Sequence, residues 1–259
     1  MSFFNRMLAS IGIGAAQVDT LLDKQRYAIG EEVRGIVKLR GGNVDQHINT
    51  IYISVMTQYA KEIDDRKVYN TGEVGRFLVT DPFTLAAGEV KEIPFSFLLP
   101  SGTPLSVGRT PIWLKTGLDI SSSVDPTDDD RIEVSPSAEM RTVLDAVSEL
   151  GFQLRKADCE YAPRLGYGAF AQELEYYPVS GPFRGKLDEL EVIFVPNRSG
   201  GPLEVLLQID RRVRGLASLF SEAMDLDESF VRVRLDAALL SGGARAVAGE
   251  LESVIRRYA

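Results

Sequence analysis

Between Val18 and Val134, apolar and polar residues alternate in short runs that end in Gly or Pro turns. In EEVRGIVKLRGG, residues 31–42, apolar residues and a Gly alternate with mostly basic residues until Gly41 and Gly42 end the run. Because successive side chains of a β-strand point to opposite faces, this periodicity predicts half-buried strands, and several such strands with tight turns favour an antiparallel β-sandwich. The same alternation recurs in further runs: TIYISVMTQYAK, RFLVTDPFTL and KEIPFSFLLP.

The periodicity changes after Pro136, where apolar residues recur at steps of three and four. This spacing predicts a connecting helix with one buried face. Gly151 follows, at a position where helices commonly end in a left-handed residue. The residues on the predicted buried face are Met140, Val143, Leu144, Val147 and Leu150.

The rest of the C-terminal half mixes strand and helix patterns. Alternating runs return between residues 152 and 210 and again in SFVRVRLDA, while helical spacing occurs in residues 213–224 and 247–258. A short helical stripe of apolar residues also lies within residues 3–11. These patterns predict a second, smaller sheet, an N-terminal helix and C-terminal helices.

The change of periodicity divides the chain into two predicted domains. Residues 1–136 form an N-terminal β-sandwich, and residues 137–259 form the connecting helix and a C-terminal β-rich domain with a helical tail. A length of 259 residues with 44% hydrophobic residues is sufficient for two ordinary domains. The predicted fold class is therefore mainly β, with two antiparallel β-sandwich domains.

The charge balance narrows the range of partners. A formal net charge of -8 argues against a general nucleic-acid binder and against adhesion to anionic lipid. No stretch has the roughly 18 apolar residues that a membrane span needs, so stable membrane insertion is not expected. A single cysteine, Cys159, cannot form an internal disulfide, and the predicted location is the cytoplasm.

The sequence offers no recognisable catalytic arrangement. Its one histidine, His47, lies in a polar turn, and no G-x-S-x-G segment is present to supply a nucleophilic serine. Zinc sites built from His and Cys are excluded by the number of these residues. The Gly-rich segment LGYGAFAQ leads into a strand pattern, whereas a phosphate-binding loop needs a helix there. We therefore expect no enzyme, no catalytic residue and no cofactor.

The segment TGLDISSSVDPTDDDRIEV, residues 116–134, gathers five aspartates. Short acidic side chains can converge on a hard cation, so Asp125, Asp128 and Asp130 are candidate calcium ligands. The EF-hand order fails, however, because its central Gly and closing Glu are missing. A solvated acidic loop is the other interpretation. A third interpretation is that the aspartates form ion pairs with the basic run at 211–214, whose guanidinium groups suit bidentate carboxylate binding.

A set of short motifs resembles the sporulation-control protein family of spore-forming and related bacteria. The resemblance extends over residues 12 to 216, and the loop after KEIPFSFLLP also resembles the N-domains of arrestins. Each motif is weak alone, and the set carries the likeness. The motifs are GIGAAQVDT, GGNVDQHI, PFSFLLPSGTPLS, WLKTGLDI with DPTDDD, LGFQLRKA, QELEYYP, LDELEV and IDRRVRGL.

The resemblance implies an arrestin-like fold and a non-enzymatic regulatory role. Arrestins hold their resting arrangement with a buried core of opposed Asp and Arg residues, and an analogue is expected here at the domain joint. Breaking a buried pair of this kind typically costs about 3–5 kcal/mol, whereas an exposed pair contributes about 0–1 kcal/mol. The candidate members of the polar core are Asp119, Asp125, Asp128 and Asp130 with Arg211 and Arg212, and Arg131 is a further candidate.

The predicted function is that of a cytoplasmic adaptor that binds other proteins through its β-sandwiches, for instance by strand addition. The resemblance implies regulatory, cytoskeletal or division proteins as partners and leaves a homodimer open. The alternative function is a metal- or ligand-responsive sensor that uses the Asp-rich loop 125–130.

Overall fold

The structure of the chain is a computed structural model. It describes residues 15–64, 66–121, 125–165, 168–197, 200–210 and 230–258. The helices predicted within residues 3–11 and 213–224 lie outside these ranges. The chain divides into two compact units: unit 1 comprises Met1–Thr57, Glu73–Pro100 and Pro111–Glu133, and unit 2 comprises Gln58–Gly72, Ser101–Thr110 and Val134–Ala259.

One sheet of unit 1 has three antiparallel strands in the order β1-β3-β7. They are β1 (Gln17–Leu22), β3 (Glu32–Arg40) and β7 (Val90–Leu98). The alternation predicted for residues 33–39 is confirmed, because Val33, Val37 and Leu39 are buried. Gly35 belongs to the same face, where a Cβ atom would lie 2.4 Å from the carbonyl oxygen of Leu21. The sheet thus needs Gly at this position.

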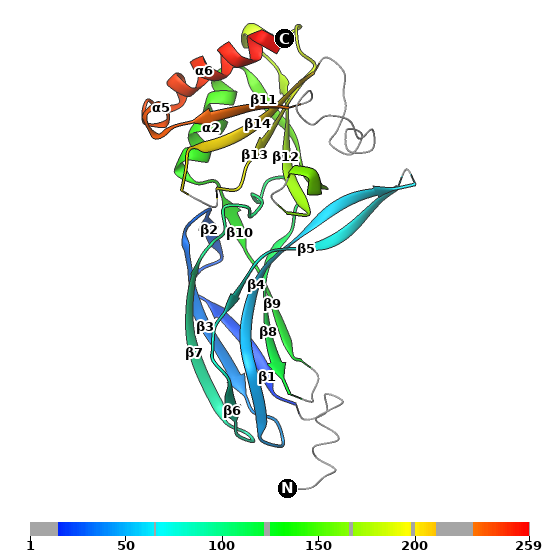
Figure 1. Cartoon of the computed structure of the whole chain (residues 1–259), viewed down its shortest axis with the longest axis vertical. Coiled ribbons are helices and arrows are strands. Elements are labelled where there is room, and N and C mark those ends of the chain that lie inside the picture. The colour runs from blue at the N-terminus through cyan, green and yellow to red at the C-terminus, as the bar shows by residue number, and fades with distance from the viewer. Residues whose placement is uncertain are drawn as a thin grey trace. The chain divides into compact units, whose positions relative to one another are not determined.

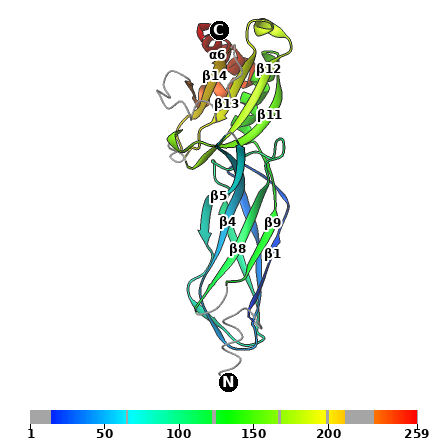
Figure 2. The same ribbon diagram turned by 90° about the vertical axis from the view of Figure 1, so that its right-hand side faces the viewer.

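The second sheet of unit 1 is built around the long strand β4, which continues into unit 2. Figures 1 and 2 show the two sheets of unit 1 facing each other, and a buried hydrogen bond of 2.7 Å joins the hydroxyls of Thr20 and Thr116. Strand β4 is flanked by β8 and β6, and β9 lies beyond β8. The bounds are β4 (Gln46–Ile63), β5 (Arg66–Leu78), β6 (Phe83–Leu85), β8 (Ile112–Ile120) and β9 (Thr127–Arg131).

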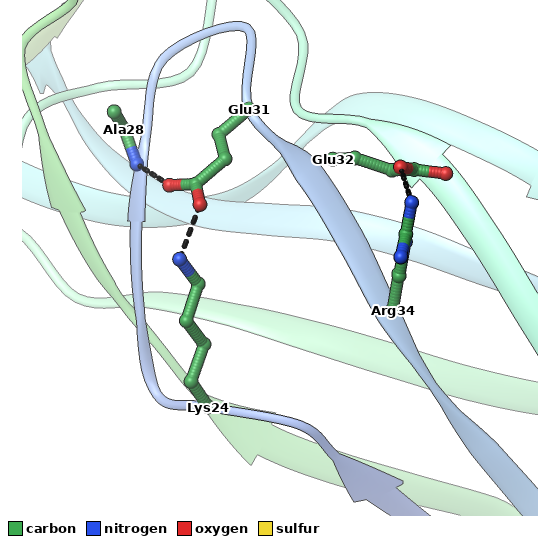
Figure 3. Close-up of polar contacts among 5 residues, drawn as sticks. All are labelled: Lys24, Ala28, Glu31, Glu32 and Arg34. Atoms are coloured by element: carbon green, nitrogen blue, oxygen red, sulfur yellow. Dashed lines mark hydrogen bonds and ion pairs between the residues drawn. The ribbon is translucent and has the colours of Figure 1, made fainter.

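A polar turn leads from β2 (Arg26–Ala28) into β3. Figure 3 shows the Glu31 carboxylate between the Lys24 ammonium and the backbone N–H of Ala28, which donates a 2.8 Å hydrogen bond to it. The hydrogen bond from Lys24 is the largest cause that lowers the pKa of Glu31, and the hydrogen bond from Ala28 is the second. Glu32 and Arg34 form a second exposed pair beside it. Both pairs are solvent-exposed, so neither is a major source of stability.

Unit 2 contains an antiparallel sheet in which consecutive strands are neighbours, from β11 to β15. A parallel contact between Ala60 of β4 and Glu160 of β11 adds the end of β4 to its edge. This sheet confirms the prediction of a second set of strands after Gly151. The strands are β11 (Phe152–Tyr161), β12 (Phe170–Pro178), β13 (Glu189–Phe194), β14 (Leu203–Asp210) and β15 (Val231–Leu235).

Two helices, α2 (Ala138–Glu149) and α6 (Gly243–Tyr258), pack on one another against this sheet (Figure 1). The Ser137 hydroxyl begins α2 by accepting a 3.2 Å hydrogen bond from the N–H of Met140. Gly151 follows α2 with φ 87°, as the sequence predicted. Short elements complete the described chain: β10 (Glu133–Ser135), α5 (Ala237–Ser241) and the 3-10 turns η1 (Pro163–Leu165) and η2 (Gly181–Phe183).

The structure confirms a mainly β chain with several antiparallel sheets, a connecting helix and C-terminal helices. The division at residues 136 and 137 stays a prediction, and unit 2 also takes residues 58–72 and 101–110. Among the described helices, none combines the length and the apolar character that a membrane crossing requires.

Candidate functional site

The predicted Asp-rich segment lies on one edge of the second sheet of unit 1. Asp119 belongs to β8, Asp125 to the turn that follows, and Asp128 and Asp130 to β9. Among the described strands, β9 pairs only with β8. Asp128 and Asp130 are half-buried while Asp129 between them is exposed, so the strand turns alternate carboxylates toward the interior of unit 1.

Three of these aspartates accept hydrogen bonds from neighbours in unit 1. Asp128 accepts a 2.7 Å bond from the backbone N–H of Thr20 in β1, which belongs to the opposite sheet. Asp125 accepts a 3.0 Å bond from the N–H of Ile120, and Asp119 accepts a 3.1 Å bond from the Asn49 amide. The segment therefore joins the edges of the two sheets and closes the turn between β8 and β9.

Asp130 differs from the others because its Oδ2 atom is buried without a hydrogen-bond partner. Burial raises the pKa of Asp130 to about 6, and the nearby charges of Asp128 and Asp19 act in the same direction. A raised carboxyl pKa means that folding favours the protonated form. Stability is then greatest below the ordinary value of 3.8 and falls as the pH rises through about 6.

An Asp130→Asn variant is therefore expected to be more stable than the native chain at pH 7 by about 1 kcal/mol, a value reduced for partial exposure. The two proteins should be equally stable at pH 3.5. Urea unfolding at pH 3.5, 5 and 7 measures the difference. Asp129→Asn, an exposed change in the same strand, is the control and should remain within about 0.5 kcal/mol of the native chain. A loss of stability in Asp130→Asn at pH 7 would contradict the assignment.

The predicted partners of the aspartates, Arg211 and Arg212, lie outside the described residues, so the interdomain polar core stays a prediction. Arg131 is described and exposed. In the part of the chain that the structure describes, no three His, Cys, Asp or Glu side chains are arranged to hold a metal ion. Asp125, Asp128 and Asp130 are among these described residues.

Unit 2 contains a second acidic group that the sequence analysis missed. The register places Glu175 of β12 opposite Glu191 of β13. Glu173 and Glu189 lie two residues from them and therefore share the same face of the sheet. All but Glu175 are buried, and Glu191 is only 2% exposed. We call Glu173, Glu175, Glu189 and Glu191 the glutamate face.

Arg155 forms ion pairs with two members of the glutamate face. Its Nη1 atom lies 3.3 Å from Glu175 Oε1 and 3.8 Å from Glu189 Oε2. Both carboxylate oxygens of Glu191 are buried, and the carboxyl group lies against those of Glu173 and Glu189. Burial raises the pKa of Glu191 well above its usual range, and the charge of Glu173 raises it further. Burial likewise raises the pKa of Glu189, and the nearby charge of Glu175 raises it further. Burial therefore favours the protonated forms of Glu189 and Glu191.

A sequence signal for the glutamate face exists in QELEYYP and LDELEV, where Glu alternates with Leu. The alternation indicates that the glutamates of each strand share a face. It does not show that the two strands are neighbours, nor that this face is buried.

The third notable surface is the hairpin formed by β4 and β5, which Figure 1 shows as a two-stranded ribbon. Its distal residues are exposed on both faces between Arg66 and Tyr69. Three large apolar side chains are exposed there: Ile63, Val68 and Tyr69, the last with 69% of its surface accessible. Among the described strands, β5 pairs only with β4.

The base of this hairpin is fixed by aromatic packing within unit 2. The Tyr59 ring stacks on Phe170 at 5.3 Å and on Tyr161 at 6.0 Å between ring centroids. Gly72 of β5 lies against the same group, and a Cβ atom there would be 2.4 Å from Phe170 Cε1. Within the distal stretch, Lys67 forms a 2.8 Å ion pair with the buried carboxylate of Glu160. The exposed end of the hairpin thus extends from an anchored base.

A Gly72→Ala variant is expected to lose about 1–3 kcal/mol of stability, because the new methyl group must displace the stacked Phe170 ring. The control is Gly249→Ala in α6, where a Cβ atom would meet nothing within 4 Å. That change should be neutral or stabilising by up to about 1 kcal/mol, since Ala favours helix. Chemical denaturation of both variants measures the effect, and equal stability of the two would show that the ring is not held in place.

Comparison with known proteins identifies relatives over the whole length of the chain. The sequence profile of the SpoOM protein family matches residues 4–213. The sporulation-control protein spo0M of Bacillus subtilis strain 168 is 41% identical over 260 aligned residues, which cover 100% of both chains.

The crystal structure of Spo0M, the sporulation control protein from Bacillus subtilis, is similar to this structure with a TM-score of 0.83. The two share 38% sequence identity, and the match covers 95% of this chain and 100% of the other. These findings confirm the resemblance inferred from the short motifs. With a family match over most of its length and a full-length relative at 41% identity, this chain belongs to the SpoOM protein family.

Proposed function

We propose that this protein is a non-enzymatic regulatory adaptor that binds partner proteins by strand addition to β5. The observation that carries the proposal is the exposure of β5 on both faces between Arg66 and Tyr69, with β4 as its one neighbour among the described strands. Unpaired backbone N–H and C=O groups of an edge strand can pair with a strand of another chain.

The side chains beside this edge suit recognition of a protein. Tyr69 and Val68 are exposed by 69% and 42%, respectively. Tyr is enriched at interfaces because its ring buries a large apolar area while its hydroxyl can still form hydrogen bonds. In strand addition the backbone supplies affinity and alternate side chains supply specificity. The anchored base at Tyr59 reduces the ordering that binding would otherwise require.

The relatives suggest the process in which the adaptor acts. The matched protein of Bacillus subtilis is named a sporulation-control protein, and we infer the same type of regulatory role for this chain. Regulatory, cytoskeletal or division proteins of the cytoplasm are the partners proposed. A second copy of the chain could use the same edge, which would give a homodimer.

The test compares the native chain with a Val68→Asp, Tyr69→Asp double variant. Proteins retained from a lysate of the native organism are identified by mass spectrometry, and the partner is then purified and titrated calorimetrically. The double variant should bind at least tenfold more weakly, because two charged groups would be buried at the added strand. Its melting temperature should hardly change, since both side chains are already exposed.

The matched control is Val90→Asp in β7, an apolar side chain that is 68% exposed on another strand. It should bind the partner as the native chain does. Equal binding by the native chain and the double variant would refute the β5 surface. Light scattering of each protein alone determines whether a second copy occupies the edge.

A further inference from the structure

A tight turn after η2 presents two basic side chains, Arg184 and Lys186, to solvent. Arg184 has φ -57° and ψ 124°, and Gly185 has φ 73°. The N–H of Lys186 donates a 3.0 Å hydrogen bond to the carbonyl oxygen of Phe183. These are features of a type II turn, whose third residue is usually Gly because its φ is positive. The turn therefore places one basic residue on each side of Gly185.

Both ends of this turn are anchored in the interior of unit 2. Phe183 is 1% exposed and Leu187 is 4% exposed. The Phe183 ring packs against the ring of Phe152, with 5.6 Å between the centroids. The N–H of Leu187 also donates a 3.2 Å hydrogen bond to the carbonyl oxygen of Phe183. Because the backbone is held on both sides, the turn needs little further ordering when a partner binds.

The C-terminal end of α6 brings a third cation to the same place. The guanidinium carbon of Arg256 lies 5.8 Å from the centroid of the Phe183 ring, and Figures 1 and 2 show the end of α6 beside the segment that follows β12. Arg257 is the next residue of this last helical turn, and both side chains are exposed. Cations are favourable at this end of a helix because of the helix dipole. We call Arg184, Lys186 and Arg256 the basic patch.

The charge of the basic patch is opposite to that of the whole chain. The two segments that form it, residues 181–188 and 252–258, contain four basic and two acidic residues, whereas the chain has a net charge of -8. Of the two acidic residues, Glu252 pairs with Arg256 at 2.5 Å and Asp188 follows the turn. An excess of positive charge on held elements attracts carboxylates, and the planar fork of Arg can bind both oxygens of one carboxylate.

We propose that the basic patch docks an acidic peptide segment of a partner protein, whose carboxylates bind Arg184, Lys186 and Arg256. An anionic membrane is a poorer match, since it would meet the whole chain, which carries a net charge of -8, with a surface of the same sign. A short peptide contacts the patch alone, and salt screens the more distant charges. The patch lies on other elements than β5, so the proposal does not depend on strand addition.

The test measures the binding of fluorescently labelled hexaglutamate to the full chain by fluorescence anisotropy, with hexaglutamine as the neutral control peptide. Hexaglutamate should bind saturably at about 50 mM salt and about fivefold more weakly at about 300 mM salt, where charges are more strongly screened. Hexaglutamine should not bind. The Arg184→Gln, Lys186→Gln double variant should bind hexaglutamate about tenfold more weakly, because two charge-assisted contacts are lost.

The matched control is the Arg141→Gln, Arg245→Gln double variant. It removes the same charge from exposed positions in the first turns of α2 and α6, whereas Arg256 lies in the last turn of α6. The control should bind hexaglutamate within about twofold of the native chain, since distant charges are screened. Neither double variant should change the melting temperature appreciably, because all four side chains are exposed.

Three results would overturn the proposal. The first is an absence of saturable hexaglutamate binding to the native chain, and the second is an equal loss of binding in the two double variants. The third comes from sedimentation with vesicles that contain about 30% phosphatidylserine. If these vesicles retain the native chain but not the Arg184→Gln, Lys186→Gln variant, and hexaglutamate does not compete, the patch binds a membrane instead.

Discussion

A Glu191→Gln variant is expected to be more stable than the native chain by about 2 kcal/mol at pH 7 and equally stable at pH 4. Glu191 is 2% exposed, and its carboxyl group lies against those of Glu173 and Glu189. Burial raises its pKa, so the folded protein keeps it protonated at a pH where the unfolded chain releases the proton. Gln resembles the protonated carboxyl and removes this proton uptake.

The direction of the pH dependence follows from the raised pKa. The stability contributed by the protonated group is fully present below the ordinary value of 4.5. It is lost as the pH rises, at up to about 1.4 kcal/mol per pH unit, until the folded-state pKa is reached. Glu189 has its pKa raised too and adds to the same slope. The native chain should therefore be less stable at pH 7 than at pH 5.

Urea unfolding of both proteins from pH 4 to pH 8 measures this slope. Glu250→Gln, an exposed change on α6, is the control and should leave the profile unchanged. A Glu191→Gln profile parallel to the native one would show that Glu191 is ionised in the folded protein. The glutamate face would then require a cation that compensates its charge.

A Leu251→Ala variant is expected to lose about 2–5 kcal/mol of stability. Leu251 is fully buried on α6, together with Val247 and Ile255. Truncation removes apolar contacts and leaves a cavity that neighbouring side chains fill only in part. The reason for a large effect is that α6 packs on α2 and thereby forms part of the layer that covers the sheet of unit 2.

Thermal and chemical unfolding measure this loss, with Glu250→Ala as the control. Glu250 precedes Leu251 on the exposed face of the same helix, so its removal should change stability by less than about 0.5 kcal/mol. A similar small effect in Leu251→Ala would mean that the C-terminal helix is not integral to the core of unit 2.

The aspartates illustrate how a motif can mark a family and still have a local structural role. Asp128 joins the edges of two sheets through the N–H of Thr20, and Asp125 closes a turn through the N–H of Ile120. Asp130 also faces inward, and burial together with the nearby charges of Asp128 and Asp19 raises its pKa. These contacts give Asp125 and Asp128 structural roles within unit 1, and the polar core with Arg211 and Arg212 stays a prediction.

The sequence was sufficient to predict an element wherever a single periodic segment forms a single strand or helix. The alternation in β3 and the helical spacing of α2 each match the buried residues of the structure. Both patterns arise from the geometry of the element itself, because side chains repeat every second residue in a strand and about every 3.6 residues in a helix. Gly151 was predictable for a similar local reason, since few residues other than Gly adopt its φ of 87°.

The glutamate face was not predictable, because the Glu–Leu alternation of β12 and β13 resembles a strand with one solvated face. Only strand pairing brings Glu175 opposite Glu191. The packing at the base of the hairpin was not predictable either. The run TIYISVMTQYAK predicted a strand, but it did not show that Tyr59 stacks on Tyr161 and Phe170, which come from another part of the chain.

The sequence by itself determined which segments are strands and helices, which face of each is apolar, and, through its motifs, the family. Those properties depend on neighbouring residues in the chain or on the motifs as a set. The tertiary structure alone decided which carboxylates meet on one face and which strand edge lacks a second neighbour among the described strands. Each depends on segments far apart in the sequence, whose pairing is set by the packing of the whole unit.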